Sequence, residues 1–204
     1  MVDTVSFFCY IPQMLQQPWI VMGCGRSGSS TVARILNNHF RINMGDKLRG
    51  PDPFAPLGYY EDADMHAMNK SFLWGQTSYP DWCYWTQIYI KKRQARDIPW
   101  GFKVGGVPYF LGLYLSLLPK PKIIRVIRKF SLVHHSQVTK WKHDPDMCKR
   151  TIMGKMKALR RVLQYVPHQQ IYFNERRRSD KEIAKEISEF WKININDPST
   201  LRNM

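Results

Sequence analysis

Trp19-Ile-Val-Met-Gly-Cys-Gly-Arg-Ser-Gly-Ser-Ser30 is the stretch that decides the fold. Its first four residues, Trp19 to Met22, are apolar and predict a buried strand. A turn of glycines and serines follows, and Thr31 to Leu36 then has the apolar spacing of a helix. A strand, a glycine-rich turn and a helix start together predict an anion-binding loop, because backbone N–H groups and the positive end of the helix dipole face the ligand.

The loop lacks the lysine that nucleoside triphosphatases carry. Gly23 and Gly28 stand at the spacing G-x-x-x-x-G, but the next residue is Ser29. In loops that bind a triphosphate, a lysine at this position reaches the β- and γ-phosphates. The sequence therefore indicates a different phosphorylated nucleotide.

A second anion-binding segment lies further along the chain. Lys122-Ile-Ile-Arg-Val-Ile-Arg128 predicts a strand that ends in arginine, and Ser131 to Trp141 predicts a helix that contains Ser136. A kinase or ATPase usually has an aspartate at such a strand end to hold Mg²⁺. The cation of Arg128 would instead meet a phosphate directly.

Both segments resemble motifs of the sulfotransferases that use 3′-phosphoadenosine 5′-phosphosulfate (PAPS). Gly25-Arg-Ser-Gly-Ser-Ser30 is similar to their 5′-phosphosulfate loop, and Arg128 followed eight residues later by Ser136 is similar to their 3′-phosphate motif. The resemblance implies a P-loop α/β fold and a chain that binds PAPS and releases its desulfated product, PAP.

Three more stretches resemble sulfotransferases of the bacterial type, in family order. They are Gly58-Tyr-Tyr-Glu-Asp62 with Asn69 downstream, Trp100-Gly-Phe-Lys103, and Ile171-Tyr-Phe-Asn-Glu175 with the helix that follows it to Phe190. The resemblance therefore runs from about residue 19 to about residue 193 and implies a short member of the bacterial or viral type.

The resemblance implies a donor site. Arg26 would bind oxygens of the 5′-phosphosulfate and stabilise charge on the leaving phosphate. Arg128 and Ser136 would bind the 3′-phosphate, which distinguishes PAPS from other adenine nucleotides. Backbone N–H groups and hydroxyls of the loop would complete the site: Gly25, Ser27, Gly28, Ser29 and Ser30.

The resemblance also implies two catalytic residues besides Arg26. Lys103 matches a strand-end lysine that contacts the transferring group. Glu61 matches the glutamate base of some members, with Asp62 and Asp64 as less favoured candidates. A carboxyl group in a partly apolar pocket beside Tyr59 would have the raised pKa that a base needs.

Strands that alternate with helices predict one α/β domain over residues 1–204, a three-layer P-loop NTPase-like fold with a central parallel sheet flanked by helices. Ser179 and Glu182 predict a capping box for the last helix, whose inner face would be Ile183, Ile187, Phe190 and Trp191. The remaining expected elements are strands at 100–104 and 123–127, a strand or packed arm at 5–11, helices at 62–73, 108–118 and 151–165, and a loop at 43–56.

The composition is that of a folded basic protein. Of the 204 residues 44% are hydrophobic, and 31 Lys and Arg against 16 Asp and Glu give a net charge of +15, which attracts polyanions. Lys91-Lys-Arg93 and Arg176-Arg-Arg178 are the densest basic runs, and such runs are typical of solvated surface. The longest apolar run, Val104 to Leu118, is interrupted and short for a membrane span. We expect a cytoplasmic protein with reduced cysteines, no metal site and no membrane partner.

These observations favour a sulfotransferase that moves a sulfuryl group from PAPS to a hydroxyl or amine of a carbohydrate or small metabolite. One alternative is a catalytically inactive nucleotide-binding module of the same fold. Two differences from the family support it: Lys103-Val-Gly-Gly106 stands where many bacterial members have Lys-Asp-Pro-Arg, and Gly105 stands where cytosolic eukaryotic members have a histidine. Another is a basic nucleic-acid-binding protein, and a P-loop kinase is the third.

Overall fold

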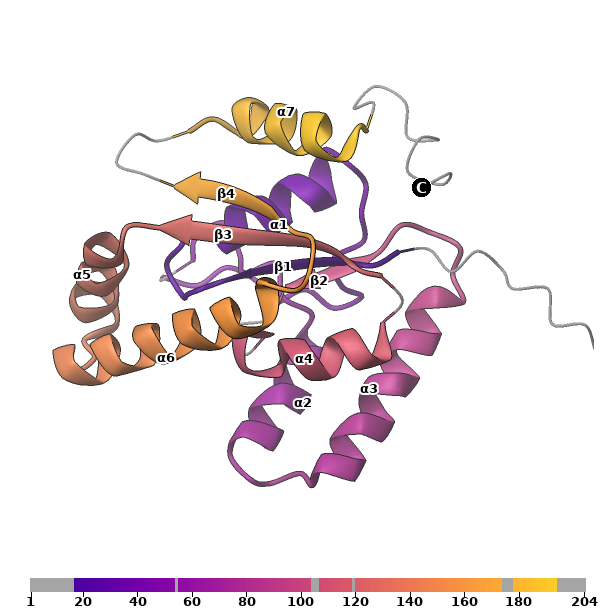
Figure 1. The fold of residues 1–204 in the computed structure, drawn as a ribbon, viewed down its shortest axis with the longest axis horizontal. Helices are drawn as coiled ribbons and strands as arrows, with labels where there is room; N and C mark the ends of the chain where they lie inside the picture. The colour runs from indigo at the N-terminus through magenta and orange to yellow at the C-terminus, as the bar shows by residue number, and fades with distance from the viewer. Residues whose placement is uncertain (1–16, 54, 104–106, 119, 174–177, 194–204) are drawn as a thin grey trace, which may run out of the picture.

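A parallel sheet of four strands forms the centre of the molecule (Figure 1). The computed structural model describes residues 17–53, 55–103, 107–118, 120–173 and 178–193. The strands have the order β2-β1-β3-β4, with β1 at Trp19–Gly23, β2 at Gly101–Lys103, β3 at Lys122–Arg128 and β4 at Gln169–Phe173. All three pairings are parallel, so the carboxyl ends of the strands lie at one edge, the side on which the arrowheads of β3 and β4 point toward α5 (Figure 1).

Helices cover both faces of the sheet. Helices α1 (Ser29–Asn38) and α7 (Asp180–Trp191) pack on one face, and α4 (Val107–Leu117) and α6 (Pro145–Leu163) on the other. Helix α5 (Phe130–Trp141) follows β3 beyond the carboxyl ends, while α2 (Ala63–Leu73) and α3 (Tyr79–Gln94) form a hairpin below α4 (Figure 1). The predicted three-layer α/β architecture is confirmed.

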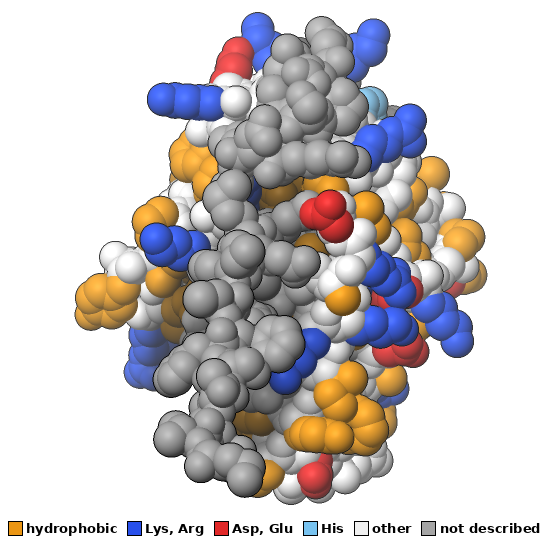
Figure 2. All heavy atoms as spheres, turned by 90° about the vertical axis from the view of Figure 1, so that its right-hand side faces the viewer, with side chains coloured by type: hydrophobic (Ala, Val, Ile, Leu, Met, Phe, Trp, Pro, Cys, Tyr) orange, Lys and Arg blue, Asp and Glu red, His pale blue; other side chains and the backbone are white. Residues whose placement is uncertain are grey.

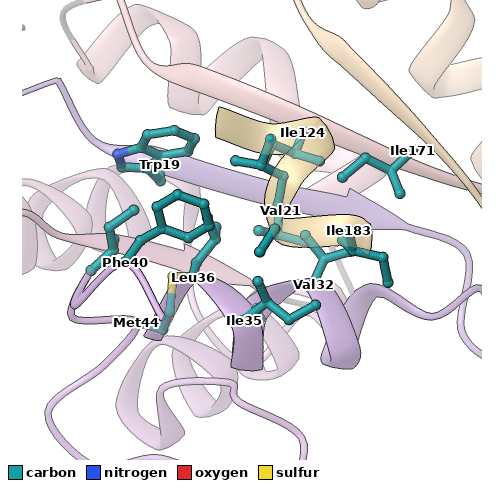
Figure 3. Close-up of a cluster of buried hydrophobic side chains, with 14 of the residues drawn as sticks. Trp19, Val21, Val32, Ile35, Leu36, Phe40, Met44, Ile124, Ile171 and Ile183 are labelled. Carbon is teal, nitrogen blue, oxygen red and sulfur yellow. The ribbon is translucent and has the colours of Figure 1, made fainter. Parts of the chain in front are cut away.

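The first core lies between the sheet and the α1–α7 layer (Figure 3). Alternate residues of the strands point into it, because successive side chains of a strand face opposite sides. The close-up shows the side chains that meet there: Trp19, Val21, Val32, Ile35, Leu36, Phe40, Met44, Ile124, Ile171 and Ile183.

The second core lies on the other face and extends into the α2–α3 hairpin. The intervening strand residues Ile20, Met22 and Ile123 pack against α4 and α6. The hairpin is attached through an aromatic cluster in which Trp82 of α3 lies 5.5 Å from Tyr114 of α4, ring centre to ring centre. The stripe of Met65, Met68, Asn69 and Phe72 on α2 belongs to this packing.

Several predictions of elements need correction. The sequence analysis did not predict α3, a 16-residue helix with a low amphipathic signal and exposed aromatic residues on its surface. Helix α6 begins at Pro145 instead of 151, because Asp144 caps it through the Met147 amide. The capping box of Ser179 and Glu182 is confirmed, but Phe190 is 53% exposed and does not belong to the inner face of α7. The predicted segment 5–11 lies outside the described residues.

Arg93 does not lie on a solvated surface as its basic run predicted. Its side chain is 1% exposed, and its Nη1 donates to Asp46 Oδ1 at 2.6 Å while Nη2 donates to Asn43 Oδ1 at 3.0 Å. The guanidinium carbon also lies 5.7 Å from the ring centre of Trp100. Arg93 therefore attaches α3 to the segment that leads from α1 toward the site.

The basic charge extends to the end of the molecule opposite the carboxyl ends of the strands. Figure 2 views this side and shows Lys and Arg side chains at several places on it, with fewer acidic ones. The net charge of +15 is therefore not confined to one site. Within the described residues, no helix is both long enough and apolar enough to cross a bilayer.

Replacing Arg93 with alanine is expected to lower the free energy of unfolding by about 3 kcal/mol, because the change removes a buried partner of Asp46 and leaves a void between α3 and the sheet. The neighbouring Lys92 is 62% exposed, so Lys92→Ala is expected to change stability by less than about 0.5 kcal/mol. Urea unfolding of both variants checks this, and equal losses would contradict the anchoring role of Arg93.

Candidate functional site

The loop between β1 and α1 has the backbone geometry of an anion cradle. Arg26 and Gly28 both have positive φ, 71° and 100°, and the Ser27 amide donates to the Cys24 carbonyl at 3.0 Å. Turns of this kind direct successive N–H groups toward one point. A Cβ on Gly28 would lie 2.9 Å from the Phe173 ring, so glycine is required there by space as well as by conformation.

Helix α1 begins without a capping side chain. Gly28 is its N-cap and has no side chain to accept from the first amides, and the first turn holds no acidic residue. By contrast, the side chains of Asp62, Ser78, Asp144 and Ser179 cap α2, α3, α6 and α7. Helix α5, which follows β3, likewise receives no capping hydrogen bond from the side chain of its N-cap residue, Lys129. The two helices that start at the carboxyl ends of neighbouring strands thus both offer positive helix ends to an anion.

The two predicted phosphate motifs come together although they are more than a hundred residues apart. Arg26 Nε donates to Ser136 Oγ at 3.0 Å, and Arg128 Nη1 donates to the Arg26 carbonyl at 3.0 Å. Gln137 Nε2 donates to the Gly25 carbonyl at 2.9 Å. The loop is therefore fixed in place by the end of β3 and by α5.

Gln137 is a site residue that the sequence analysis missed. It is 5% exposed, and its only signal in the sequence is that it follows Ser136. A buried amide that holds a loop carbonyl orients the neighbouring N–H groups outward.

Ser27 is buried, yet its hydroxyl has no hydrogen-bond partner in the part of the chain that the structure describes. The residue is 1% exposed and lines a hollow between the loop, β3, α5 and α6. Arg125 and Arg128 also line this hollow, together with apolar residues of α5 and α6. A buried hydroxyl without a partner is unfavourable by about 1–3 kcal/mol, a cost that an anion ligand would remove.

A second group of charges surrounds Glu61 at the end of β2. Lys103 Nζ lies 2.7 Å from Glu61 Oε1, and Arg49 Nη1 lies 2.7 Å from Oε2. His66 Nδ1 lies 3.3 Å from Oε2. The side chains of Glu61 and Lys103 are 6% and 7% exposed, so this pair is buried. The structure thus brings together the two predicted catalytic residues, Glu61 and Lys103.

The expected raised pKa of Glu61 is wrong. Burial acts to raise it, but hydrogen bonding by His66 and the charge and hydrogen bond of Lys103 outweigh burial and lower the pKa to about 2. Burial lowers the pKa of Lys103, and the charge of Glu61 opposes that change. A carboxylate held by three partners remains ionised and is a weak base.

The other acidic candidates have structural roles or lie in solvent. Asp62 caps α2 and also accepts from the Asp46 amide at 2.8 Å, while Asp64 is exposed. Arg49 and His66 were missed, because one lies in a predicted loop and the other on a helix, with no signal that both reach the same carboxylate. The downstream Asn69 is also structural, since its Oδ1 accepts from Trp82 Nε1 at 2.9 Å and from the Tyr114 hydroxyl at 2.8 Å.

No family model matches this sequence, and no curated protein sequence matches it. Solved structures do resemble the fold. The shikimate kinase of Bacteroides thetaiotaomicron has a TM-score of 0.51 and 9% identity over 86% of this chain and 98% of the kinase. An unliganded sugar kinase of Janibacter sp. HTCC2649 has a TM-score of 0.52 and 11% identity over 91% of this chain and 98% of the kinase. The chain therefore has an α/β P-loop-type fold.

The low pKa of Glu61 predicts a pH-dependent stabilisation. Because the pKa of the folded state lies below that of the unfolded chain, the stabilisation is present above pH 5 and is lost as the pH falls toward 2. The difference in unfolding free energy between wild type and Glu61→Gln is expected to shrink by about 2 kcal/mol from pH 6 to pH 3. Urea unfolding at several pH values measures it, and a difference that stays constant would mean that Glu61 has an ordinary pKa.

Proposed function

We propose that this chain is a PAPS-dependent sulfotransferase that transfers a sulfuryl group to a hydroxyl or amine of a carbohydrate or small metabolite. The observation that carries the proposal is the contact of Arg26, Ser136 and Arg128 at the start of α1. These residues match the 5′-phosphosulfate and 3′-phosphate motifs of that family. Because one PAPS molecule carries both groups, membership in the family requires that these residues lie close together.

The donor would lie across the carboxyl ends of β1 and β3. The amides at the start of α1 and the guanidinium of Arg26 would bind the 5′-phosphosulfate. Arg128 and Ser136 would bind the 3′-phosphate. Arg26 Nε donates to Ser136 Oγ and Arg128 donates to the Arg26 carbonyl, and a phosphate with several acceptor oxygens would replace the Arg26–Ser136 hydrogen bond.

In the transfer step, the acceptor oxygen or nitrogen attacks the sulfur while the bond between sulfur and the 5′-phosphate oxygen breaks. The product PAP leaves with its phosphate, and the acceptor proton passes to a base. Negative charge grows on the leaving phosphate, where fixed N–H groups and Arg26 stabilise it more than in the ground state.

Lys103 and Glu61 would act as a pair. The Lys103 ammonium lies at the end of β2, beside the strand that leads into the loop, and would contact the transferring group. Glu61 stays a candidate base only if a bound donor draws Lys103 away, because the loss of that partner would raise the low pKa of Glu61.

The donor site predicts a preference for PAP over AMP. A ligand at about a hundred times its dissociation constant stabilises a protein by about 2.7 kcal/mol, so a thermal-shift titration resolves the difference. We expect PAP to stabilise wild type more than AMP or ATP with Mg²⁺ does, and Arg128→Ala to abolish the excess.

Two controls accompany this titration. Arg150→Ala removes an exposed arginine of α6 and should leave the preference intact. Ser136→Ala should reduce the stabilisation by PAP while leaving the stabilisation by AMP unchanged. This result separates loss of the 3′-phosphate site from loss of folding. If PAP stabilises wild type no more than AMP, the sulfotransferase proposal is wrong. Binding of RNA with steep salt dependence would then favour the nucleic-acid alternative.

Turnover separates the enzyme from an inactive module. PAP release from PAPS, measured over a panel of sugar and amino-sugar acceptors, is expected to fall by about a hundredfold or more in Lys103→Gln, because one stabilising donor at the reacting group is lost. Stabilisation by PAP should persist in that variant and shows that it is folded. A wild type that binds PAP but sulfates none of these acceptors would favour the inactive module.

A further inference from the structure

Two cations that the proposed donor site does not use belong to β3 and α6. The first is Arg125, in the middle of β3. Its strand neighbours Ile124 and Val126 face the first core, so Arg125 shares the face of Ile123, toward α6. It lines the hollow beside Cys24 and Ser27. Within the described residues the side chain of Arg125 makes no ion pair and no hydrogen bond.

The second cation is Lys155, in the middle of α6. It lies three residues after Ile152 and four before Leu159, both of which are buried, so it stands on the inward face of the helix. Its ammonium lies 6.0 Å from the ring centre of Tyr109 on α4. Among the residues that the structure describes, the Lys155 side chain makes no ion pair with a carboxylate and no hydrogen bond.

Both cations belong to segments that line the hollow beside the loop: Arg125 lines it directly, and Lys155 lies on α6 between Ile152 and Met156, which also line it. Burial lowers the pKa of Lys155, and the charges of Cys24 and Glu61 act in the opposite direction. Burial raises the pKa of Cys24, and the charges of Lys155 and Arg125 oppose that change. Lys155 and Arg125 therefore lie within electrostatic range of the same loop residue.

An inward-facing lysine without a counter-ion is unfavourable, because its ammonium has lost water and gained no partner. The adjacent loop lacks a lysine where a triphosphate-binding loop has one, since Ser29 stands there. A cation supplied by another element can take over that contact, because a phosphate or sulfate oxygen requires only a positive charge at hydrogen-bond distance.

We propose that Arg125 and Lys155 form an anion subsite beside the loop that binds the terminal oxyanion of the bound nucleotide. The inference rests on the proposed function, in which that oxyanion is the sulfuryl group of PAPS. A terminal phosphate, as in ADP, has the same tetrahedral chemistry, and the experiment separates the two.

The test compares ligands that differ only in the terminal group. Affinities for PAPS and PAP, measured by titration calorimetry without acceptor, are compared in wild type, Lys155→Met and Arg125→Met. We expect each change to weaken the affinity for PAPS at least tenfold and to alter the affinity for PAP less than twofold. The exposed Lys157 of the same helix provides the matched control, since Lys157→Met should leave both affinities unchanged.

Unfolding of the ligand-free variants adds an independent readout. Removal of an unpaired, inward-facing charge should leave the unfolding midpoint of Lys155→Met equal to or above that of wild type. A lysine that served only to stabilise the fold would lower the midpoint. Equal loss of PAPS and PAP affinity, or a PAPS affinity equal to that of Lys157→Met, would overturn the subsite.

Failure of the proposed function gives a different result. If wild type binds neither PAP nor PAPS, the same variants are tested with ADP and AMP. A preference for ADP that Lys155→Met abolishes would support the subsite and reject PAPS as its ligand. If wild type binds none of the four nucleotides, both proposals are overturned.

Discussion

The parallel pairing of β1 with β2 and β3 is the constraint on which the rest of the site depends. The register places Val21 opposite Lys103 and Gly23 opposite Val126, so all three strands end at the same edge. Parallel strands require crossovers, and the crossover after β1 begins with α1 while that after β3 begins with α5. Two helix N-termini are thereby brought to one place, and the hydrogen bonds of Arg128 and Gln137 to loop carbonyls fix their relative position.

The charges at this edge are distributed unevenly. Glu61 has three cationic or polar partners, and two of them, His66 and Lys103, lower its pKa to about 2 despite burial. On the α6 side, the side chains of Arg125 and Lys155 make no ion pair and no hydrogen bond within the described part of the chain. A folded protein tolerates an excess of positive charge on inward-facing side chains more readily where an anion binds, because the ligand supplies the missing negative charge. This excess of positive charge is the basis of the proposed anion subsite, and the Glu61 cluster lies at the end of β2.

The sequence predicted most of the helices and strands and the meeting of the two phosphate motifs. It did not predict most of the other contacts between distant residues. Strand β1, helix α1 and strand β3 were predicted from apolar runs bounded by glycine, proline and arginine, and these patterns are local. Helix α3 was missed, because it packs on one narrow stripe around Trp82 and leaves aromatic residues in solvent, which weakens the helical periodicity. Arg93 was assigned to the surface from its basic run, but its distant partners Asp46 and Asn43 make burial possible.

By itself the sequence determined the order of all strands and helices described except α3, the glycine-rich loop with serine in place of lysine, and the pair of motifs that resembles the sulfotransferases. Each of these features depends on short stretches of consecutive residues, so it can be predicted without knowledge of long-range contacts. The tertiary structure decided how the charges are paired: it placed Arg49, His66 and Lys103 around Glu61, and it left Lys155 facing inward with no ion pair among the described residues. A pKa and a counter-ion depend on distances between residues far apart in the chain, and folding alone sets those distances.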